Sequence, residues 1–212
     1  MPLQRGILCV KGAMHMDFSQ TQTAAALMRA FAGESQAQMR YTLAAQLAKQ
    51  QQLPLIGQVF QFTAKQERTH AGLFAQRMQQ HGLTLQQITA DYPVDPQDDL
   101  AAILDSAAQH ERAEADEVYP AFAKTAQDEG FLPEAQLFTQ LAAIERSHSE
   151  RFAMFAQMIQ DGTLFREDGQ TMWMCMHCGH LHVGTEPPKS CPVCGAVQGW
   201  AVRRRLAPYT AE

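Results

Sequence analysis

Glu145-Arg-Ser-His148 lies in the last long helical stretch of the chain and repeats, almost letter for letter, the earlier motif Glu67-Arg-Thr-His70. Residues three apart lie on the same face of a helix, so each motif directs one carboxylate and one imidazole the same way. Divalent iron accepts this pair of ligands. A single Glu-x-x-His is weak evidence, whereas two copies on separate predicted helices indicate a metal site that the helices share.

The sequence around these motifs predicts four long helices. Ser19 or Thr21 is the expected N-cap of the first, Pro54 suits the first turn of the second, and Gly82 is a natural C-cap for it. Gly130 and Pro133 mark a tight turn before the last helix. The predicted helices cover residues 18–52, 54–81, 98–128 and 134–162.

The connections between these helices predict the topology. Short turns join the first helix to the second and the third to the fourth, so each pair is antiparallel. The connector 83–97 contains Pro93 and Pro96 and has no helical period. Extended, it spans about 50 Å, enough to run the length of helices of about 45 Å. The predicted fold is mainly α: a ferritin-like four-helix bundle with one long crossover.

Composition and chain ends set further limits. The 212 residues carry a net charge of −5, which argues against nucleic acid as a partner, and no apolar run is long enough for a membrane helix. The N-terminus lacks a secretory pattern, so we expect a cytoplasmic protein. The predicted segments are an N-terminal tail 1–17 with an unpaired Cys9 of no function, the bundle 18–162, a polar linker 163–172 and a small domain 173–209.

Acidic and imidazole side chains recur near the middle of all four helices, on faces that are otherwise largely apolar. Burying several carboxylates there costs many kcal/mol unless cations compensate, and two divalent cations would do so. The alternative is a set of solvated or salt-bridged glutamates with two incidental histidines. The candidate ligands are Glu34, Glu67, His70, Glu111, Glu114, Glu145 and His148, and the apolar neighbours are Phe31, Phe60, Leu73, Leu104, Phe122, Leu141 and Phe152.

Glu114 is a fifth carboxylate against the four positive charges of two ferrous ions. An additional anion favours the diferric state. Our hypothesis is that Glu114 is a ligand mainly after oxidation and that His70 replaces it on reduction.

The motifs Ala32-Gly-Glu-Ser-Gln-Ala37, Glu67-Arg-Thr-His70, Glu111-Arg-Ala-Glu114 with Tyr119-Pro120, and Glu145-Arg-Ser-His148 together resemble rubrerythrin. The resemblance covers residues 18–205 and includes the domain order. It implies a non-haem di-iron peroxidase that reduces hydrogen peroxide to water. It also implies a homodimer in which the rubredoxin-like domain of one subunit approaches the di-iron site of the other.

The same resemblance implies roles for individual residues. The iron ligands would be Glu34, Glu67, Glu111, Glu114, Glu145 and His148, with His70 exchanging for Glu114 as the redox state changes. Tyr41 and Tyr119 match tyrosines that hydrogen-bond near the irons. The alternative for both is an ordinary buried tyrosine with a satisfied hydroxyl.

A separate metal site is predicted near the C-terminus. Cys175-Met-His-Cys178-Gly179 and Cys191-Pro-Val-Cys194-Gly195 are two Cys-x-x-Cys knuckles, each followed by a glycine that permits a tight turn. Four thiolates accept zinc or iron equally well. The pattern resembles the truncated rubredoxin domain of rubrerythrins, which favours iron and implies electron relay from an external NAD(P)H-linked redox protein.

Other residues of the small domain are expected to have lesser roles. Trp173 and Trp200 are expected to pack inside it, and His177, His180 and His182 to lie on its surface. Arg203-Arg-Arg205 is expected to be a solvated charge run, or otherwise a guide for an acidic electron donor. Two other functions remain open: a ferroxidase or iron-storage protein, and a zinc-ribbon interaction protein on an inactive bundle.

Overall fold

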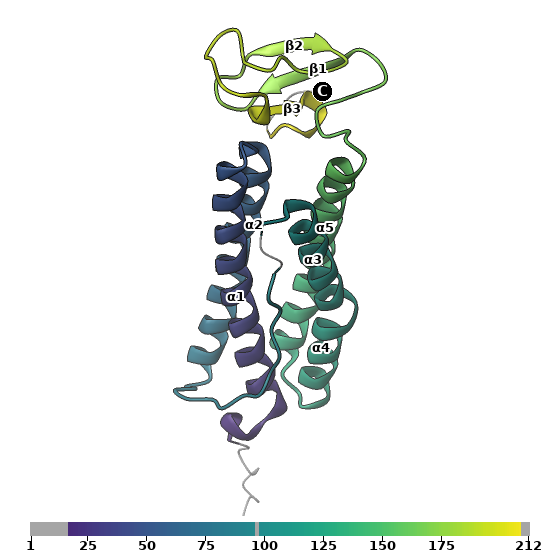
Figure 1. Cartoon of the computed structure of the whole chain (residues 1–212). Coiled ribbons are helices and arrows are strands. Elements are labelled where there is room, and N and C mark those ends of the chain that lie inside the picture. Colours follow the sequence, from purple (N-terminus) through teal and green to yellow (C-terminus); the bar gives the residue numbers. More distant parts are fainter. Residues whose placement is uncertain (1–16, 96–97, 209–212) are drawn as a thin grey trace, which may run out of the picture.

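The structure, a computed structural model, describes residues 17–95 and 98–208, so all of the predicted tail except Asp17 lies outside it, Cys9 included. The chain forms an antiparallel helical bundle with a small sheet domain at one end (Figure 1). Within the described ranges no helix combines the length and apolar character needed to cross a membrane. The bundle helices are α1 (Gln22–Gln50), α2 (Pro54–Gln80), α3 (Leu100–Ala113), α4 (Tyr119–Asp128) and α5 (Leu132–Gln160).

The helix ends follow local signals in the sequence. The Thr21 side chain accepts a hydrogen bond from the Ala24 amide (3.1 Å), which confirms Thr21 as the N-cap of α1. Pro54 occupies the first turn of α2, and Gly82 follows that helix with a positive φ of 68°. The third predicted helix consists of α3 and α4 joined by a π-turn, Glu114–Val118.

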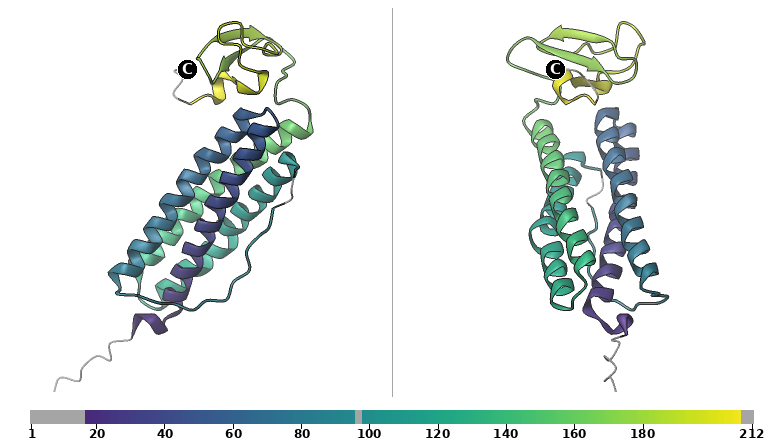
Figure 2. Two further views of the ribbon diagram at one scale, coloured as in Figure 1. Left: turned by 60° about the vertical axis from the view of Figure 1, so that its left-hand side comes forward. Right: turned by 180° about the vertical axis from the view of Figure 1, so that it is seen from behind.

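The long connector lies along α1 and confirms the single crossover (Figure 2). Gln36 donates a hydrogen bond to the Pro93 carbonyl (2.6 Å). One turn further along α1, Arg40 holds the Asp95 carboxylate through two nitrogens, at 2.5 and 2.7 Å. These contacts tie a segment without secondary structure to the helix it passes.

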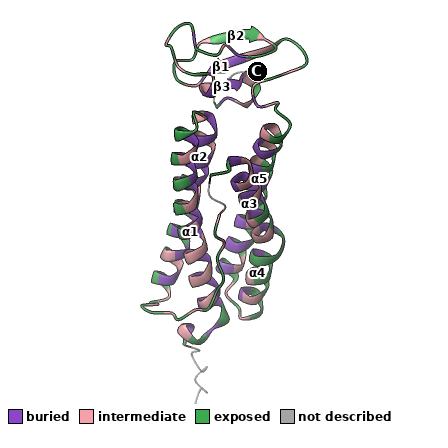
Figure 3. Cartoon of the chain, in the orientation of Figure 1, coloured by how far each residue is buried: buried purple, intermediate pink, exposed green. Residues whose placement is uncertain are grey.

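The apolar core is divided into two clusters, one toward each end of the bundle. The cluster near the sheet domain is centred on Tyr41, Phe60 and Phe152. The cluster at the other end is centred on Phe74 and Phe138. Buried positions face inward all along the helices (Figure 3). Each long helix therefore passes from one apolar cluster to the other, and the middle of the bundle lies between them.

The C-terminal domain is a three-stranded antiparallel sheet in the order β2-β1-β3. Trp173 on β1 is 1% exposed, which confirms it as a packing aromatic. The His177 ring meets the edge of Trp200 at a centroid distance of 5.2 Å. The strands are β1 (Thr171–Cys175), β2 (Leu181–Gly184) and β3 (Ala201–Arg203).

Two expectations from the sequence are wrong. Arg203 is 4% exposed, so it does not belong to a solvated charge run: its side chain turns inward from β3. Leu73 is 36% exposed and does not border the interior, because it falls outside the inward stripe of α2 that includes His70 and Phe74.

One stabilising contact joins the two helical hairpins at their far end. Glu129, at the end of α4, accepts hydrogen bonds from the Gln22 and Thr23 amides (2.9 and 2.8 Å) at the start of α1. Partial burial alone would raise the pKa of Glu129. These two bonds and a third from the Thr23 hydroxyl outweigh burial, so the net effect is a lowered pKa.

We expect Glu129→Ala to lower the free energy of unfolding by about 1 kcal/mol at neutral pH, the usual contribution of an N-cap. Denaturant unfolding measures this, with Glu150→Ala, an exposed position on α5, as the control. Because the folded pKa is lowered, the stabilisation is present above about pH 4.5 and is lost as the pH falls through the folded pKa. A difference that persists unchanged in acid would contradict this assignment.

Candidate metal centres

The predicted ligands meet in the middle of the bundle, in the band between the two apolar clusters. Helices α1, α2, α3 and α5 contribute, and the side chains come together because each helix presents them on its inward face. Six residues of the band are at most 5% exposed: Glu34, Glu67, His70, Glu111, Glu145 and His148.

These six residues form two groups, each around one histidine. Nδ1 of His70 lies 3.1 Å from Glu67 Oε2, 3.1 Å from Glu145 Oε1 and 3.5 Å from Glu34 Oε2. Within this group the ligand atoms all lie within 4.8 Å of one another. The group offers one nitrogen and three oxygens, a donor set suited to a divalent transition metal.

The second group is built in the same way. Nδ1 of His148 lies 2.9 Å from Glu67 Oε1, 2.8 Å from Glu145 Oε2 and 3.7 Å from Glu111 Oε2. Glu67 and Glu145 therefore give one oxygen to each group. The two imidazoles are nearly parallel, with ring centroids 5.7 Å apart. Two carboxylates shared between neighbouring groups are what a bridged pair of metal ions requires.

The hydrogen bonding of these atoms tests whether metal ions fit. Buried polar groups in proteins are nearly always hydrogen-bonded, and exceptions need a reason. Although charged atoms lie close by, none of the six atoms listed next has a partner with hydrogen-bond geometry. They are Glu34 Oε2, Glu67 Oε1, Glu111 Oε2, both carboxylate oxygens of Glu145, and His148 Nδ1. Donor atoms that converge without bonding to one another fit a pair of divalent cations.

Two tyrosines bind the outer carboxylates. The Tyr41 hydroxyl donates to Glu111 Oε1, and the Tyr119 hydroxyl donates to Glu34 Oε1. Each tyrosine thus reaches across the bundle to the glutamate of the opposite hairpin. Burial and the charge of the bound glutamate raise the pKa of both phenols well above the usual value, so they remain donors.

Aromatic residues follow a regular spacing from the glutamates. Phe60 and Phe152 were expected on these faces, whereas Phe74 and Phe138 were missed. Phe60 and Phe74 lie seven residues before and after Glu67, a step of about two turns that keeps them on its face. Phe138 and Phe152 flank Glu145 in the same way, and Tyr41 follows Glu34 by seven. Tyr119 follows Glu111 by eight, and the π-turn accommodates the additional residue.

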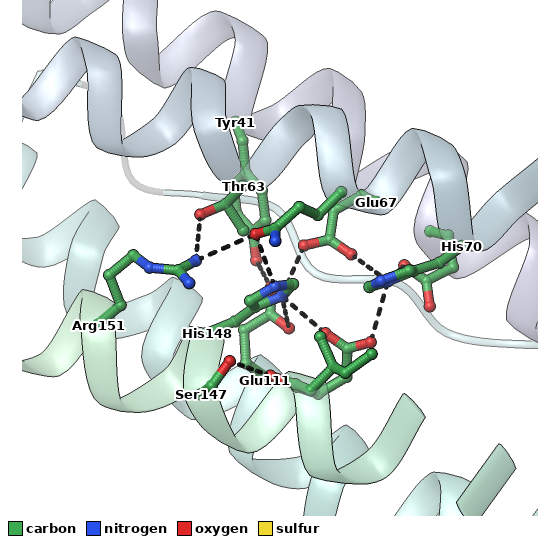
Figure 4. A network of polar contacts seen from close by, with 12 residues as sticks. Tyr41, Thr63, Glu67, His70, Glu111, Ser147, His148 and Arg151 are labelled. Carbon is green, nitrogen blue, oxygen red and sulfur yellow. Dashed lines mark hydrogen bonds and ion pairs between the residues drawn. The ribbon is translucent and has the colours of Figure 1, made fainter. Parts of the chain in front are cut away.

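A polar chain on the outer side of His148 was also missed (Figure 4). Nε2 of His148 lies 3.1 Å from Gln66 Oε1, which can only accept, so Nε2 carries the hydrogen and Nδ1 faces the carboxylates. Nη1 of Arg151 lies 3.4 Å from the same Gln66 oxygen and donates to Thr63 Oγ1 at 2.9 Å. The position of Gln66 directly before Glu67 was the available signal.

Glu114 is placed apart from both groups. It lies on the π-turn and lines a cavity of about 210 Å³ next to Tyr41, Glu111 and Tyr119. A Cβ added at Gly33 would be 3.7 Å from Glu114 Oε1, so Gly33 of α1 borders this carboxylate at ordinary contact distance. Such a volume admits several molecules of the size of water. Glu114 thus faces a small cavity. Of the two residues that the hypothesis exchanges as ligand, His70 and not Glu114 lies among the clustered carboxylates.

Proton affinities in this band follow from burial and charge. Burial lowers the pKa of both imidazoles, but the carboxylates outweigh it and raise the pKa of His70 to about 12 and of His148 to about 11. Burial and the charge of Glu67 raise the pKa of Glu111 to about 8. Burial also raises the pKa of Glu34 and Glu114 well above the usual value. Burial alone would raise the pKa of Glu67, but the imidazoles of His148 and His70 outweigh it and lower that pKa to about 2, so the two imidazoles and this carboxylate favour their charged forms together.

The four predicted cysteines of the small domain come together as a second centre. Their sulfur atoms lie within 4.8 Å of one another, with Cys175 to Cys194 at 3.9 Å and Cys178 to Cys191 at 3.7 Å. The glycine after each knuckle has a positive φ, 79° at Gly179 and 72° at Gly195. This arrangement suits one tetrahedral metal ion.

Comparisons with known proteins match both the bundle and the small domain to models of the same protein family. A family model described as Rubrerythrin matches residues 25–156, and one described as the rubredoxin-like domain of rubrerythrin matches residues 173–199. A rubrerythrin of Porphyromonas gingivalis is 36% identical over 90% of this chain and 94% of its own length. Rubrerythrin-1 of Clostridium acetobutylicum is 38% identical over 82% of this chain and 90% of its own length.

Solved structures give the same picture. Nigerythrin in its fully reduced, all-ferrous state is similar with a TM-score of 0.57 and 27% identity, covering 96% of this chain and all of that one. A Desulfovibrio desulfuricans bacterioferritin with a diiron site matches 67% of this chain and 82% of its own with a TM-score of 0.59. At 22% identity it supports the fold alone.

We expect metal uptake in the bundle to release protons, because the neighbouring carboxylates raise the pKa of both imidazoles and each must lose its Nδ1 proton before Nδ1 can bind a cation. Zinc titrated into protein whose cysteine site is already zinc-loaded should release at least one proton per histidine. Calorimetry in buffers of different ionisation enthalpy measures this.

Affinity should fall as the pH is lowered from 8 to 6, since protons then compete better for the same atoms. The double variant Glu67→Ala, Glu145→Ala removes both shared carboxylates. It serves as the control for zinc binding and proton release that do not involve the bundle site. Binding without proton release would contradict the assignment of the two histidines as ligands.

Proposed function

The chain belongs to the rubrerythrin family, and we propose that it is a non-haem di-iron peroxidase that reduces hydrogen peroxide to water with electrons relayed through its Fe(Cys)₄ centre. The family is of the oxidoreductase type, and its members are iron proteins connected with oxidative stress; this chain has the residues for a di-iron site and a rubredoxin-like site. One observation carries the proposal. Glu67 and Glu145 each give one oxygen to both histidine groups.

The proposed iron ligands in the bundle are Glu34, Glu67, Glu111, Glu145 and His148, with His70 and Glu114 exchanging as the redox state changes. The four cysteines are the proposed ligands in the module. When bound, a ferrous pair supplies the two electrons that cleavage of a peroxide O–O bond consumes. Glu67 and Glu145 would each hold both ions, since each gives one oxygen to each histidine group, and Gln66 orients His148 by accepting from its Nε2. Glu34 and Glu111 stay oriented through the hydroxyls of Tyr119 and Tyr41.

Glu114 is the proposed proton carrier. Its carboxyl group faces the cavity that peroxide would enter, and burial and the charge of Glu111 raise its pKa well above the usual value, which favours the protonated form. Reduction of one peroxide to two waters consumes two electrons and two protons. Glu114 holds one such proton beside the reacting oxygen atoms and recovers it from solvent through the cavity.

We propose a separate role for each segment of the chain. Residues 18–162 form the di-iron unit, 163–172 the linker and 173–209 the electron-transfer module. An external NAD(P)H-linked redox protein reduces the module. The protein acts in the cytoplasm as a homodimer or larger homo-oligomer, which the resemblance to rubrerythrins and the four clustered thiols support.

A stoichiometric reaction tests the proposal. Iron-loaded protein is reduced without oxygen and mixed with one equivalent of hydrogen peroxide per chain, and absorption of both centres is followed. We expect one peroxide to oxidise the bundle pair, faster than one equivalent of dioxygen does, with oxidation of the module following.

Metal analysis and size-exclusion chromatography distinguish the other functions. Cage-sized assemblies that accumulate iron would show a ferroxidase or storage protein. Zinc in the cysteine site with a metal-free bundle would indicate an interaction protein.

Glu114→Ala should lower peroxide turnover by about 10²-fold, the usual contribution of a positioned proton donor. It should also raise the potential of the bundle pair, because one anion that favours the diferric state is lost. Glu117→Ala, exposed on the same π-turn, is the control. If Glu114→Ala leaves both turnover and potential unaltered, Glu114 is neither proton carrier nor ligand.

A further inference from the structure

Arg203 has a buried guanidinium group that the metal centres do not use. It lies on β3 directly opposite Trp173 of β1. Trp173 in turn lies two residues before Cys175, the first cysteine of the module. Its carbon Cζ lies 5.1 Å from the centre of the Trp173 ring. A buried cation is costly unless its donors are satisfied, so the partners of this side chain show what it does.

Those partners belong to the segment that leaves α5. Arg203 donates through Nη1 to the Leu164 carbonyl (3.2 Å), through Nη2 to the carbonyls of Thr163 and Arg166 (2.9 Å to Arg166), and through Nε to Glu167. The planar fork of arginine can reach all these acceptors at once, which the single ammonium of lysine cannot. One side chain of the sheet therefore holds the whole turn after α5.

The same segment is bound to the module by two more contacts. The Glu167 carboxylate also accepts from Arg205 Nη2 at 2.7 Å. The Glu167 amide donates to the Thr185 carbonyl at 2.8 Å. The predicted linker is thus attached to the domain that follows it.

A second attachment joins the module to the start of α2. Gly199 is buried against the turn between α1 and α2, where an added Cβ would lie 2.0 Å from the Gln52 carbonyl oxygen and 2.8 Å from Pro54 Cδ. The φ of Gly199 is not in the left-handed region, so the requirement for glycine is one of space alone. Val202, which is 3% exposed, joins the apolar cluster at this end of the bundle.

We propose that Arg203 is a positioning residue which, together with the close contact at Gly199, holds the cysteine module in one orientation on the end of its own bundle. The module then does not swing toward the iron site of its own chain. Glu34 lies sixteen residues before the end of α1, about 24 Å along the helix axis, and the module sits beyond that end. The orientation fixed in this way sets the face from which electrons leave the module.

The electron-transfer measurement described below rests on the proposed function, in which the module passes electrons to a bundle iron pair. The attachment of the module to its own bundle does not depend on that reaction.

Both tryptophans of the chain, Trp173 and Trp200, lie in the module. Time-resolved anisotropy of their fluorescence, in protein with zinc in both sites, therefore reports motion of the module alone. We expect the native chain to show a single slow correlation time, that of the whole molecule. Arg203→Met and Gly199→Ala should each add a faster component, one by losing hydrogen bonds and the other by steric repulsion.

Matched controls are Gly72→Ala, where an added Cβ meets nothing within 4 Å, and Arg77→Met at the far end of α2. Circular dichroism shows that each variant is folded, and Gly199→Ala keeps the test valid if Arg203→Met does not fold. An unchanged anisotropy decay in both folded variants would overturn the proposal.

The second readout uses iron-loaded protein. Electron transfer from the reduced module to the oxidised bundle should slow by about tenfold or more in both variants, while the visible spectrum and potential of the Fe(Cys)₄ centre stay unchanged. A module that moves freely and still transfers electrons at the native rate would refute the positioning role. If peroxide does not oxidise the native bundle, the proposed function fails, but the anisotropy result stands.

Discussion

The convergence of buried carboxylates on two imidazoles, in a layer between two apolar clusters, is the constraint on which the rest of the structure depends. Four glutamates at this depth cannot all be ionised without positive charge beside them. In the protein alone, that charge comes from protons on His70 and His148. Metal ions can replace the protons because the donor atoms already face common points. The cost of burying the acids is thus what makes the site selective for cations.

The two hairpins of the bundle contribute to this layer in nearly the same way. Each gives a terminal glutamate, a Glu-x-x-His motif and a tyrosine that binds the glutamate of the other hairpin. The π-turn breaks this likeness in the second hairpin: it adds one residue before Tyr119 and places Glu114 in the wall of the cavity. The hairpins are therefore equivalent as metal-binding units, and only the second carries the additional carboxylate on which the proposed chemistry depends.

The cysteine module is continuous with the bundle. Val202 and Ala207 share an apolar cluster with the ends of α1 and α2, and Arg203 satisfies the carbonyls that α5 leaves behind. A junction made of buried side chains limits motion much more than its polar linker sequence indicates. The positions of both metal centres are then properties of one folded unit.

The sequence by itself determined the helical topology, six of the seven candidate ligands that meet in the bundle layer and the four clustered cysteines, because spacing along one helix or one knuckle decides which side chains share a face. It predicted Thr21, Pro54 and Gly82 at helix ends for the same local reason. Which carboxylates are shared, the cross-bundle tyrosine bonds, the polar chain from Gln66 to Arg151 and the burial of Arg203 were decided only by the tertiary structure. Each of these depends on atoms from helices or strands far apart in the chain, whose distances no local pattern encodes.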